Sequence, residues 1–237
     1  MNKDQPIRLR WQTANEAPPL AESELHVWRL PLALGEEQTD ADDLSILSPG
    51  QLGRMQRLIQ PLHRRRYART QAGCRRILAQ YVGVDAGSLA FRYGPAGKPA
   101  IDRDGPVPEF NLTTSGDLAL LAVSATQPVG IDCELERARP QMLAIADQMF
   151  GADVRSALAE LTGAALQRAF HLHWTALEAR VKADGRGLTR REDPDPDGLM
   201  VAHALAGDID GRIALCAVAR RSLPAPDQWR AMQLAID

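Results

Sequence analysis

The chain of 237 residues has few cysteines, few aromatic side chains and no long apolar run. Its three cysteines, Cys74, Cys133 and Cys216, lie far apart without Cys-x-x-Cys spacing, so we expect neither a disulfide framework nor a zinc site. No apolar run approaches the ~20 residues of a membrane span, and the N-terminus lacks the apolar core of a signal peptide. These absences predict a soluble, cytoplasmic protein that does not bind membranes.

A large surplus of charge is also absent, since the formal net charge is -2. A dominant attraction to nucleic acid is therefore not expected. One basic stretch, HRRRYARTQAGCRR (His63 to Arg76), could bind phosphate, attract an acidic partner protein or only solvate a helix. Nucleic-acid binding through this stretch is disfavoured, because the aromatic content is 5% and no binding motif is present.

Turn residues and hydrophobic periodicity predict alternating helices and strands around a substantial core. We expect strands at residues 25–32, 88–94 and 98–101, a hairpin over 109–125, a strand at 128–136, and two or three strands at the C-terminus. Helices are expected after Ser48-Pro49, from about 63 to 81, at 140–150, after Gly151, and from about 163 to 184.

The order of these elements suggests an N-terminal tail at residues 1–24 and two α+β halves at 25–126 and 127–237. The segments DLALLAVSA and GRIALCAVAR are similar apolar strands, and each follows a long helix that carries arginine or lysine. Any two buried strands rich in Ala, Leu and Val look alike, so this similarity alone does not establish two related halves. A cleft between such halves would be a natural ligand site.

A first motif, PVGIDCELE, places acids at alternate positions of a predicted strand, Asp132, Glu134 and Glu136. Residues two apart share one face of a strand, so these carboxylates could converge. Converging carboxylates repel each other, and a divalent cation, a basic cluster or open water must offset the repulsion. Cys133, between the first two acids, is expected to face the core.

A second motif, FHLHWTALEARVKADGRGL, is predicted to be helical. Trp174, Glu178 and Lys182 are spaced four apart and so lie on one helix face. Alone, this pattern is also typical of an ordinary Glu–Lys surface pair beside a half-buried tryptophan. Gly185 and Gly187 allow a sharp turn at the end of the helix.

Together, VGIDCE and WTALEARVKADGRGL resemble the signature pair of the surfactin-type phosphopantetheinyl transferases, (V/I)G(V/I)D(I/V)E and W(S/T)xKEAxxKxxGxGL. YGPAGKPAI resembles the family's YGKP segment, and FNLTTSG resembles FNxSHSG. The resemblance extends from about Arg64 to Leu188. It implies an α+β fold of two similar halves related by a pseudo-twofold axis. Each half would be a long helix packed on a small, mainly antiparallel sheet, with the ligand cleft between the halves of one monomer.

The resemblance also implies an activity. The family transfers the phosphopantetheine arm of coenzyme A to a serine of an acyl or peptidyl carrier protein, with Mg²⁺, and releases 3′,5′-ADP. No residue identifies which carrier protein is the partner. The implied metal ligands are Asp132, Glu134 and Glu178; the implied catalytic residues are Glu178 and Lys182; and the implied coenzyme A contacts are Arg69, Lys98, Thr113, Thr114, Asp132 and Lys182.

Two residues depart from the family pattern. Thr114 stands where the family has a histidine that contacts a phosphate of coenzyme A, and a threonine hydroxyl can donate a hydrogen bond but brings no charge. Leu177 stands where the family has a lysine, and it should point away from the metal face. This pattern fits a working transferase, and it also fits a degenerate homologue that binds coenzyme A or a carrier protein with little turnover.

Overall fold

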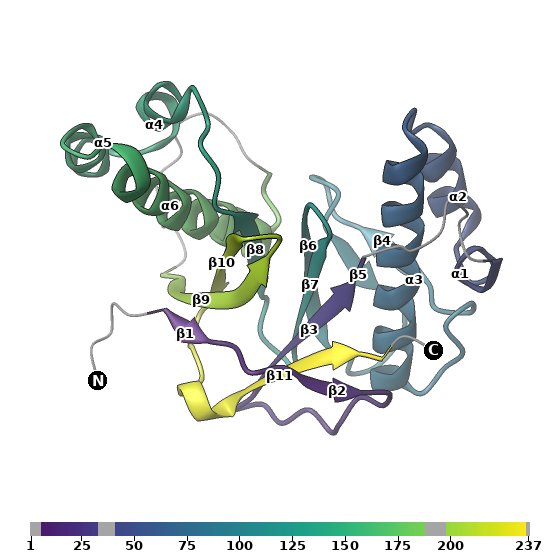
Figure 1. Ribbon diagram of the computed structural model, residues 1–237. Coiled ribbons are helices and arrows are strands. Elements are labelled where there is room, and N and C mark those ends of the chain that lie inside the picture. The colour runs from purple at the N-terminus through teal and green to yellow at the C-terminus, as the bar shows by residue number, and fades with distance from the viewer. Residues whose placement is uncertain (1–5, 33–40, 188–197, 236–237) are drawn as a thin grey trace.

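The computed structural model describes residues 6–32, 41–187 and 198–235 (Figure 1). Strands are β1 (Ile7–Arg8), β2 (Gln12–Ala14), β3 (Leu25–Pro31), β4 (Phe91–Tyr93), β5 (Pro99–Ile101), β6 (Glu109–Ser115), β7 (Leu118–Ser124), β8 (Gly130–Leu135), β9 (Met200–Ile209), β10 (Arg212–Arg220) and β11 (Trp229–Leu234). Helices are α1 (Ala41–Ser45), α2 (Pro49–Gln56), α3 (Pro61–Val82), α4 (Met142–Met149), α5 (Ala152–Ala159) and α6 (Gly163–Asp184). Leu188, the last residue of the second motif, lies outside the described residues.

Two sheets lie between the two long helices, α3 and α6 (Figure 1). One sheet has the order β1-β9-β10-β8 and the other the order β2-β11-β3-β7-β6, while β4 and β5 form a separate hairpin. Val27 and Leu120 of one sheet share a buried cluster with Ile131 and Cys216 of the other, so the main core lies between the sheets. A second cluster packs α3 on the outer face of the five-stranded sheet, and a third packs α6 on the four-stranded sheet.

Local sequence signals explain where the helices begin and end. Ser48 caps α2 through a capping box with Gln51, and Pro49 occupies the first turn. Helix α3 ends at Gly83 and α6 at Gly185, both in the left-handed conformation that glycine adopts without strain. The mixed α+β fold and these predicted elements are confirmed. The pseudo-twofold axis and the cleft stay predictions.

Both ends of the described chain contribute strands to the sheets. The expected tail supplies β1, which pairs in parallel with β9, and β2, which pairs in parallel with β11. Strand β11, from the expected second half, pairs with β3 of the first. Each sheet therefore crosses the boundaries expected from sequence, and the segment expected as a tail is part of the fold. Among the described residues, no helix is long and apolar enough to cross a membrane.

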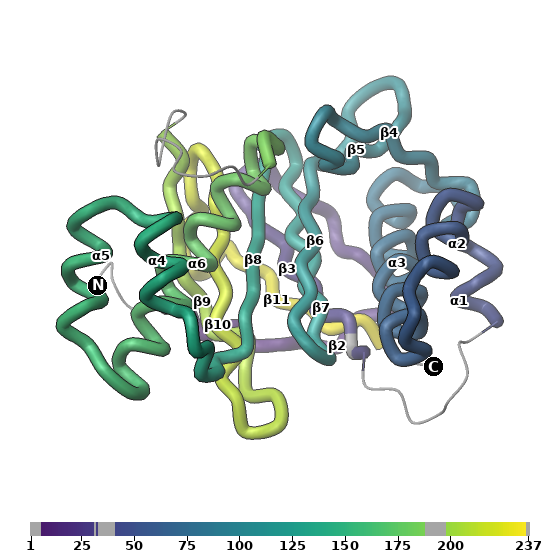
Figure 2. Tube along the Cα trace, turned by 90° about the horizontal axis from the view of Figure 1, so that it is seen from above, coloured from purple at the N-terminus to yellow at the C-terminus, as the bar shows by residue number. Residues whose placement is uncertain are grey.

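The facing edges of the two sheets, β8 and β6, lie side by side (Figure 2). In the described chain these strands are joined by side chains rather than by a backbone ladder. Three β6 side chains accept hydrogen bonds from backbone N–H groups of β8: Asn111 from Ile131 at 2.9 Å, Thr113 from Cys133 at 3.3 Å and Ser115 from Leu135 at 3.1 Å. This seam of three hydrogen bonds provides acceptors for N–H groups at the edge of β8, and it brings the hydroxyl groups of Thr113 and Ser115 close to the acids of β8.

Candidate active site

Strand β8 presents Asp132 and Glu134 on the face opposite to Cys133. Cys133 is 2% exposed and packs in the core between the sheets, as expected from the alternation of a strand. Glu136 follows the end of β8, and its carboxylate pairs with Arg168 of α6 at 2.5 Å. Two of the three alternating acids therefore reach the site, and Glu136 does not join them.

Helix α6 crosses β8 at Gly130 in unusually close contact. A Cβ atom added to Gly130 would lie 1.9 Å from the carbonyl oxygen of Ala179 and 2.4 Å from the backbone nitrogen of Ala183. Only glycine allows this approach. Because α6 lies so near the strand, Glu178 and Lys182 reach the acids of β8.

The ammonium of Lys182 lies among the carboxylates. Its Nζ is 2.6 Å from Oδ1 of Asp132 and 3.9 Å from Oε2 of Glu178, and Thr113 donates a hydrogen bond to the same Oδ1 at 3.1 Å. The Asp132 side chain is 8% exposed, so this pair is shielded from solvent. Lys182 therefore joins two secondary-structure elements, which a simple helix-surface pair would not do.

Glu134 has a different pair of partners. Arg139, on the connection between β8 and α4, donates from Nη2 to Oε1 of Glu134 at 2.7 Å, and Ser115 donates to Oε2 at 3.2 Å. Basic side chains, Lys182 and Arg139, thus offset the repulsion between the acids. Within the described residues, no three His, Cys, Asp or Glu side chains are already arranged as ligands of a metal ion.

Burial shapes the acid–base properties of the site. Burial raises the pKa of the Asp132 carboxyl, although the Lys182 ammonium opposes this shift. Burial also raises the pKa of Glu178, again against Lys182, and the neighbouring Asp132 and Glu134 add to the rise. Oδ2 of Asp132 is buried without a hydrogen-bond partner. The site can therefore accept a cation or a proton at its carboxylates.

Lys98, after the β4–β5 turn, contacts the C-terminal end of α6. Its Nζ donates to the carbonyl oxygens of Ala183 at 2.6 Å and Val129 at 3.3 Å, which caps the helix with a positive charge. A Cβ added to Gly185 would lie 3.1 Å from Cδ of Lys98, so this glycine makes room for the lysine stem. Burial lowers the pKa of Lys98.

A sequence model of the 4'-phosphopantetheinyl transferase superfamily matches residues 128–211, the segment that holds all three carboxylates and Lys182. The chain is 36% identical over 178 residues to the 4'-phosphopantetheinyl transferase HetI of Nostoc sp., covering 73% of this chain and 74% of HetI. The chain belongs to the 4'-phosphopantetheinyl transferase superfamily.

More distant relatives carry the same superfamily name. The chain is 31% identical over 146 residues to the putative 4'-phosphopantetheinyl transferase slr0495 of Synechocystis sp., covering 61% of this chain and 59% of the relative. It is 30% identical over 116 residues to the 4'-phosphopantetheinyl transferase Sfp of Bacillus subtilis, covering 48% of this chain and 50% of Sfp.

Two residues expected to contact coenzyme A in this transferase lie at different cavities. Thr114 is exposed and lines a cavity of about 440 Å³ together with Arg54, His63 and Tyr67. Arg69 lines a separate cavity of about 540 Å³ beside α3. The residues that come together are Thr113, Asp132, Glu134, Glu178 and Lys182. Thr113 also lines the cavity of Thr114, whereas Lys98 and Arg69 lie in two other surroundings. Leu177 packs against the apolar cluster of α4, α5 and α6.

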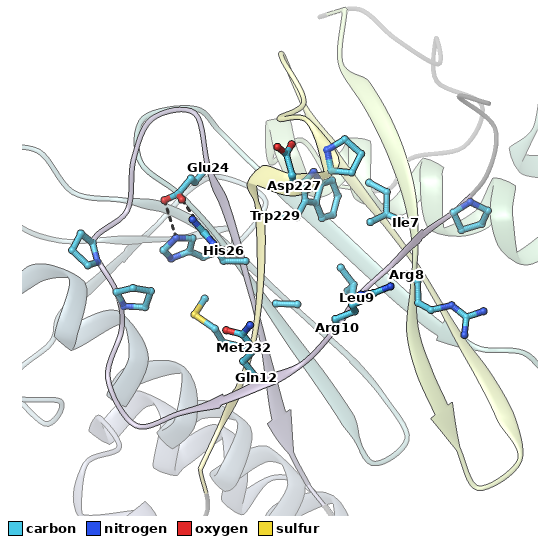
Figure 3. A pocket seen from close by; sticks show the side chains of 16 residues that line it. Ile7, Arg8, Leu9, Arg10, Gln12, Glu24, His26, Asp227, Trp229 and Met232 are labelled. Carbon is cyan, nitrogen blue, oxygen red and sulfur yellow. Dashed lines mark hydrogen bonds and ion pairs between the residues drawn. The ribbon is translucent and has the colours of Figure 1, made fainter. Parts of the chain in front are cut away.

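A larger cavity of this transferase, about 910 Å³, is shown in Figure 3, and its lining does not include the acids. Its lining includes residues 6–10, 226–227 and 229–232, together with Glu24 and His26. His26 is fully buried, with Nε2 3.4 Å from Glu24 and Nδ1 2.6 Å from the hydroxyl of Tyr81. None of the predicted site residues lines this cavity, so cavity size does not locate the active site.

Sequence reasoning missed two residues of the site, Ser115 and Arg139. The alternation of Asn111, Thr113 and Ser115 in FNLTTS was a usable signal, because hydroxyl and amide groups two apart share one strand face. No comparable signal marked Arg139 among the arginines of ELERARP.

Proposed function

We propose that this chain transfers the 4'-phosphopantetheine arm of coenzyme A to a serine of an acyl or peptidyl carrier protein, in a Mg²⁺-dependent reaction that releases 3',5'-ADP. The observation that carries the proposal is the cluster of Asp132, Glu134, Glu178 and Lys182, which β8 and α6 bring together. It lies inside the segment that matches the superfamily. A degenerate homologue is not supported, because all three carboxylates are present and the relatives are named as transferases.

The donor set fits Mg²⁺, which prefers oxygen ligands and keeps some of its waters. Asp132, Glu134 and Glu178 would hold the ion, and the buried, unpartnered Oδ2 of Asp132 is an available ligand atom. When bound, Mg²⁺ would neutralise charge on the pyrophosphate of coenzyme A.

The side chains of the cluster then accept the serine proton and stabilise the leaving group. Glu178 accepts the proton of the carrier serine while the serine oxygen forms a bond to the phosphorus of the arm. The bond between that phosphorus and the oxygen of 3',5'-ADP breaks. Lys182, held by Asp132 at 2.6 Å, stabilises the negative charge on the leaving oxygen.

The cavity beside Thr114 suits the nucleotide of coenzyme A. Arg54 lines it and offers positive charge where Thr114 offers none, and the ring of His63 lines it as well. We place a phosphate of coenzyme A there. Lys98 keeps one ammonium N–H for a phosphate beside its two hydrogen bonds to carbonyl oxygens. Arg69, at a separate cavity, is a weaker candidate for a direct contact.

Mass spectrometry tests the activity. Purified protein is incubated with coenzyme A, Mg²⁺ and apo forms of fatty acid, polyketide and peptidyl carrier proteins. A mass gain of one phosphopantetheine arm on the carrier serine is expected, and the Asp132→Asn variant is the matched control. No gain with any of the three carriers would refute the proposed function.

A further inference from the structure

Both carboxylate oxygens of Glu134 are held by other side chains of the protein. Arg139 donates to Oε1 at 2.7 Å and Ser115 donates to Oε2 at 3.2 Å. Asp132 differs, because its Oδ2 has no partner. Each oxygen of Glu134 therefore already accepts a hydrogen bond from the protein before a cation binds, and one of the two donors is a cation itself.

The two contacts of Glu134 differ in how they respond to a cation. Ser115 is neutral, and its hydroxyl also accepts a hydrogen bond from the backbone of Leu135, so it belongs to the seam between the sheets. Arg139 is always charged and repels a cation. It lies on the short connection between β8 and α4, outside both elements. A cation would therefore displace the contact of Glu134 with Arg139 rather than its contact with Ser115.

The charge balance of the cluster supports this distinction. Three carboxylates face two cations, Lys182 and Arg139, and the side chains of Glu134 and Arg139 are 19% and 22% exposed. Partial burial keeps their attraction less screened than that of a pair in open water. Removal of Arg139 would leave Glu134 with an uncompensated charge in the same place.

We propose that Arg139 is a positioning residue that holds Glu134 and competes with a divalent cation for it, so that metal binding releases the connection between β8 and α4. The inference rests on the proposed function, since the cation is the metal of that reaction. It adds Arg139 as a competitor of the cation for Glu134, and it adds a movement of residues 136–141 that is coupled to metal binding.

Binding of Mn²⁺ alone tests the competition. The EPR signal of free Mn²⁺ is lost on binding, so titration gives the dissociation constant for wild type, Arg139→Gln and Arg168→Gln. A unit charge about 6 Å from a divalent ion changes its affinity by about tenfold even in water, so Arg139→Gln should bind Mn²⁺ about tenfold more tightly. Arg168→Gln is the matched control and should bind like wild type, because Arg168 pairs with Glu136 outside the cluster.

A merely structural role for Arg139 gives the opposite result, since a disturbed site binds metal more weakly. Unchanged or weaker Mn²⁺ binding by Arg139→Gln, with wild type binding normally, overturns the inference and leaves the metal site standing. If neither protein binds Mn²⁺, the metal site and the inference both fail. The carrier-protein mass assay reports separately on transfer.

Wild-type protein gives an independent test that needs no substitution. If Mn²⁺ displaces Arg139, backbone amides at 136–141 should exchange hydrogen faster with the metal than without it. Equal or slower exchange across this segment overturns the inference even if Arg139→Gln does not fold.

Discussion

Replacing Gly130 with alanine should disrupt the site through packing alone. The added Cβ would lie 1.9 Å from the carbonyl oxygen of Ala179, whereas Cβ atoms in proteins essentially never approach another atom within 3.0 Å. Helix α6 must therefore move by more than about 1 Å, because a close-packed backbone contact cannot yield otherwise. Overpacking of this kind costs about 1 to 3 kcal/mol of unfolding free energy.

The same movement carries Glu178 and Lys182 away from Asp132. Misplacement by about 1 Å can reduce a rate about a hundredfold, so Gly130→Ala should lose activity beyond its loss of stability. Urea denaturation measures the free energy of unfolding. Mass spectrometry of the carrier protein measures the rate of transfer, under conditions well below the unfolding midpoint.

Gly53→Ala is the matched control. Gly53 lies in α2, and the nearest atom to an added Cβ, Nη1 of Arg57, is 3.9 Å away. Alanine there should stabilise the protein by about 0.5 to 1 kcal/mol and leave the rate unchanged. Wild-type stability and rate in Gly130→Ala would refute the argument that close approach of α6 to β8 builds the site.

Four further outcomes are expected. Asp132→Asn should reduce transfer to the carrier protein about a hundredfold or more, and wild-type transfer at ordinary Mg²⁺ would remove Asp132 from the metal site. Glu178→Gln should lower kcat at saturating Mg²⁺, because an amide accepts no proton, and an unchanged pH–rate profile would contradict its role as base. Thr114→His should lower the KM for coenzyme A about tenfold with little change in kcat, whereas equal KM values would mean that Arg54 already supplies the charge. Burial lowers the pKa of His203 from 6.5 to about 4, so its stabilising contribution is present above pH 6.5 and is lost as the pH falls from 6.5 towards 4. In urea titrations, the free energy of unfolding of His203→Gln should therefore fall less over that range than that of wild type. An equal fall in both proteins would exclude His203 as the cause.

Local signals made much of the fold predictable from sequence. The capping box at Ser48 and the glycines at 83 and 185 fix helix ends through contacts within a few residues, and the structure places those ends as expected. The alternation in VGIDCE and the four-residue spacing of Glu178 and Lys182 likewise follow from the geometry of one strand and one helix. Their meeting was suggested only by resemblance to a family.

Long-range pairing explains what the sequence did not reveal. Strands β1 and β2 are two and three residues long, too short for periodicity to show, and their partners lie at the other end of the chain. Arg139 gains its role only because β8 ends at Leu135 and the connection turns back towards Glu134. Glu136 leaves the cluster for the same reason.

The exchange of strands between the ends of the chain also determines how the protein could be divided. A cut between residues 126 and 127 would separate β11 from its partners β2 and β3, and β1 from its partner β9. Each fragment would carry an incomplete sheet, and the acids of β8 would lose the hydroxyl groups of β6. The two fragments would be inactive apart and would regain the site only by reassembling, so fusing them to two interacting proteins would turn carrier-protein modification into a readout of that interaction.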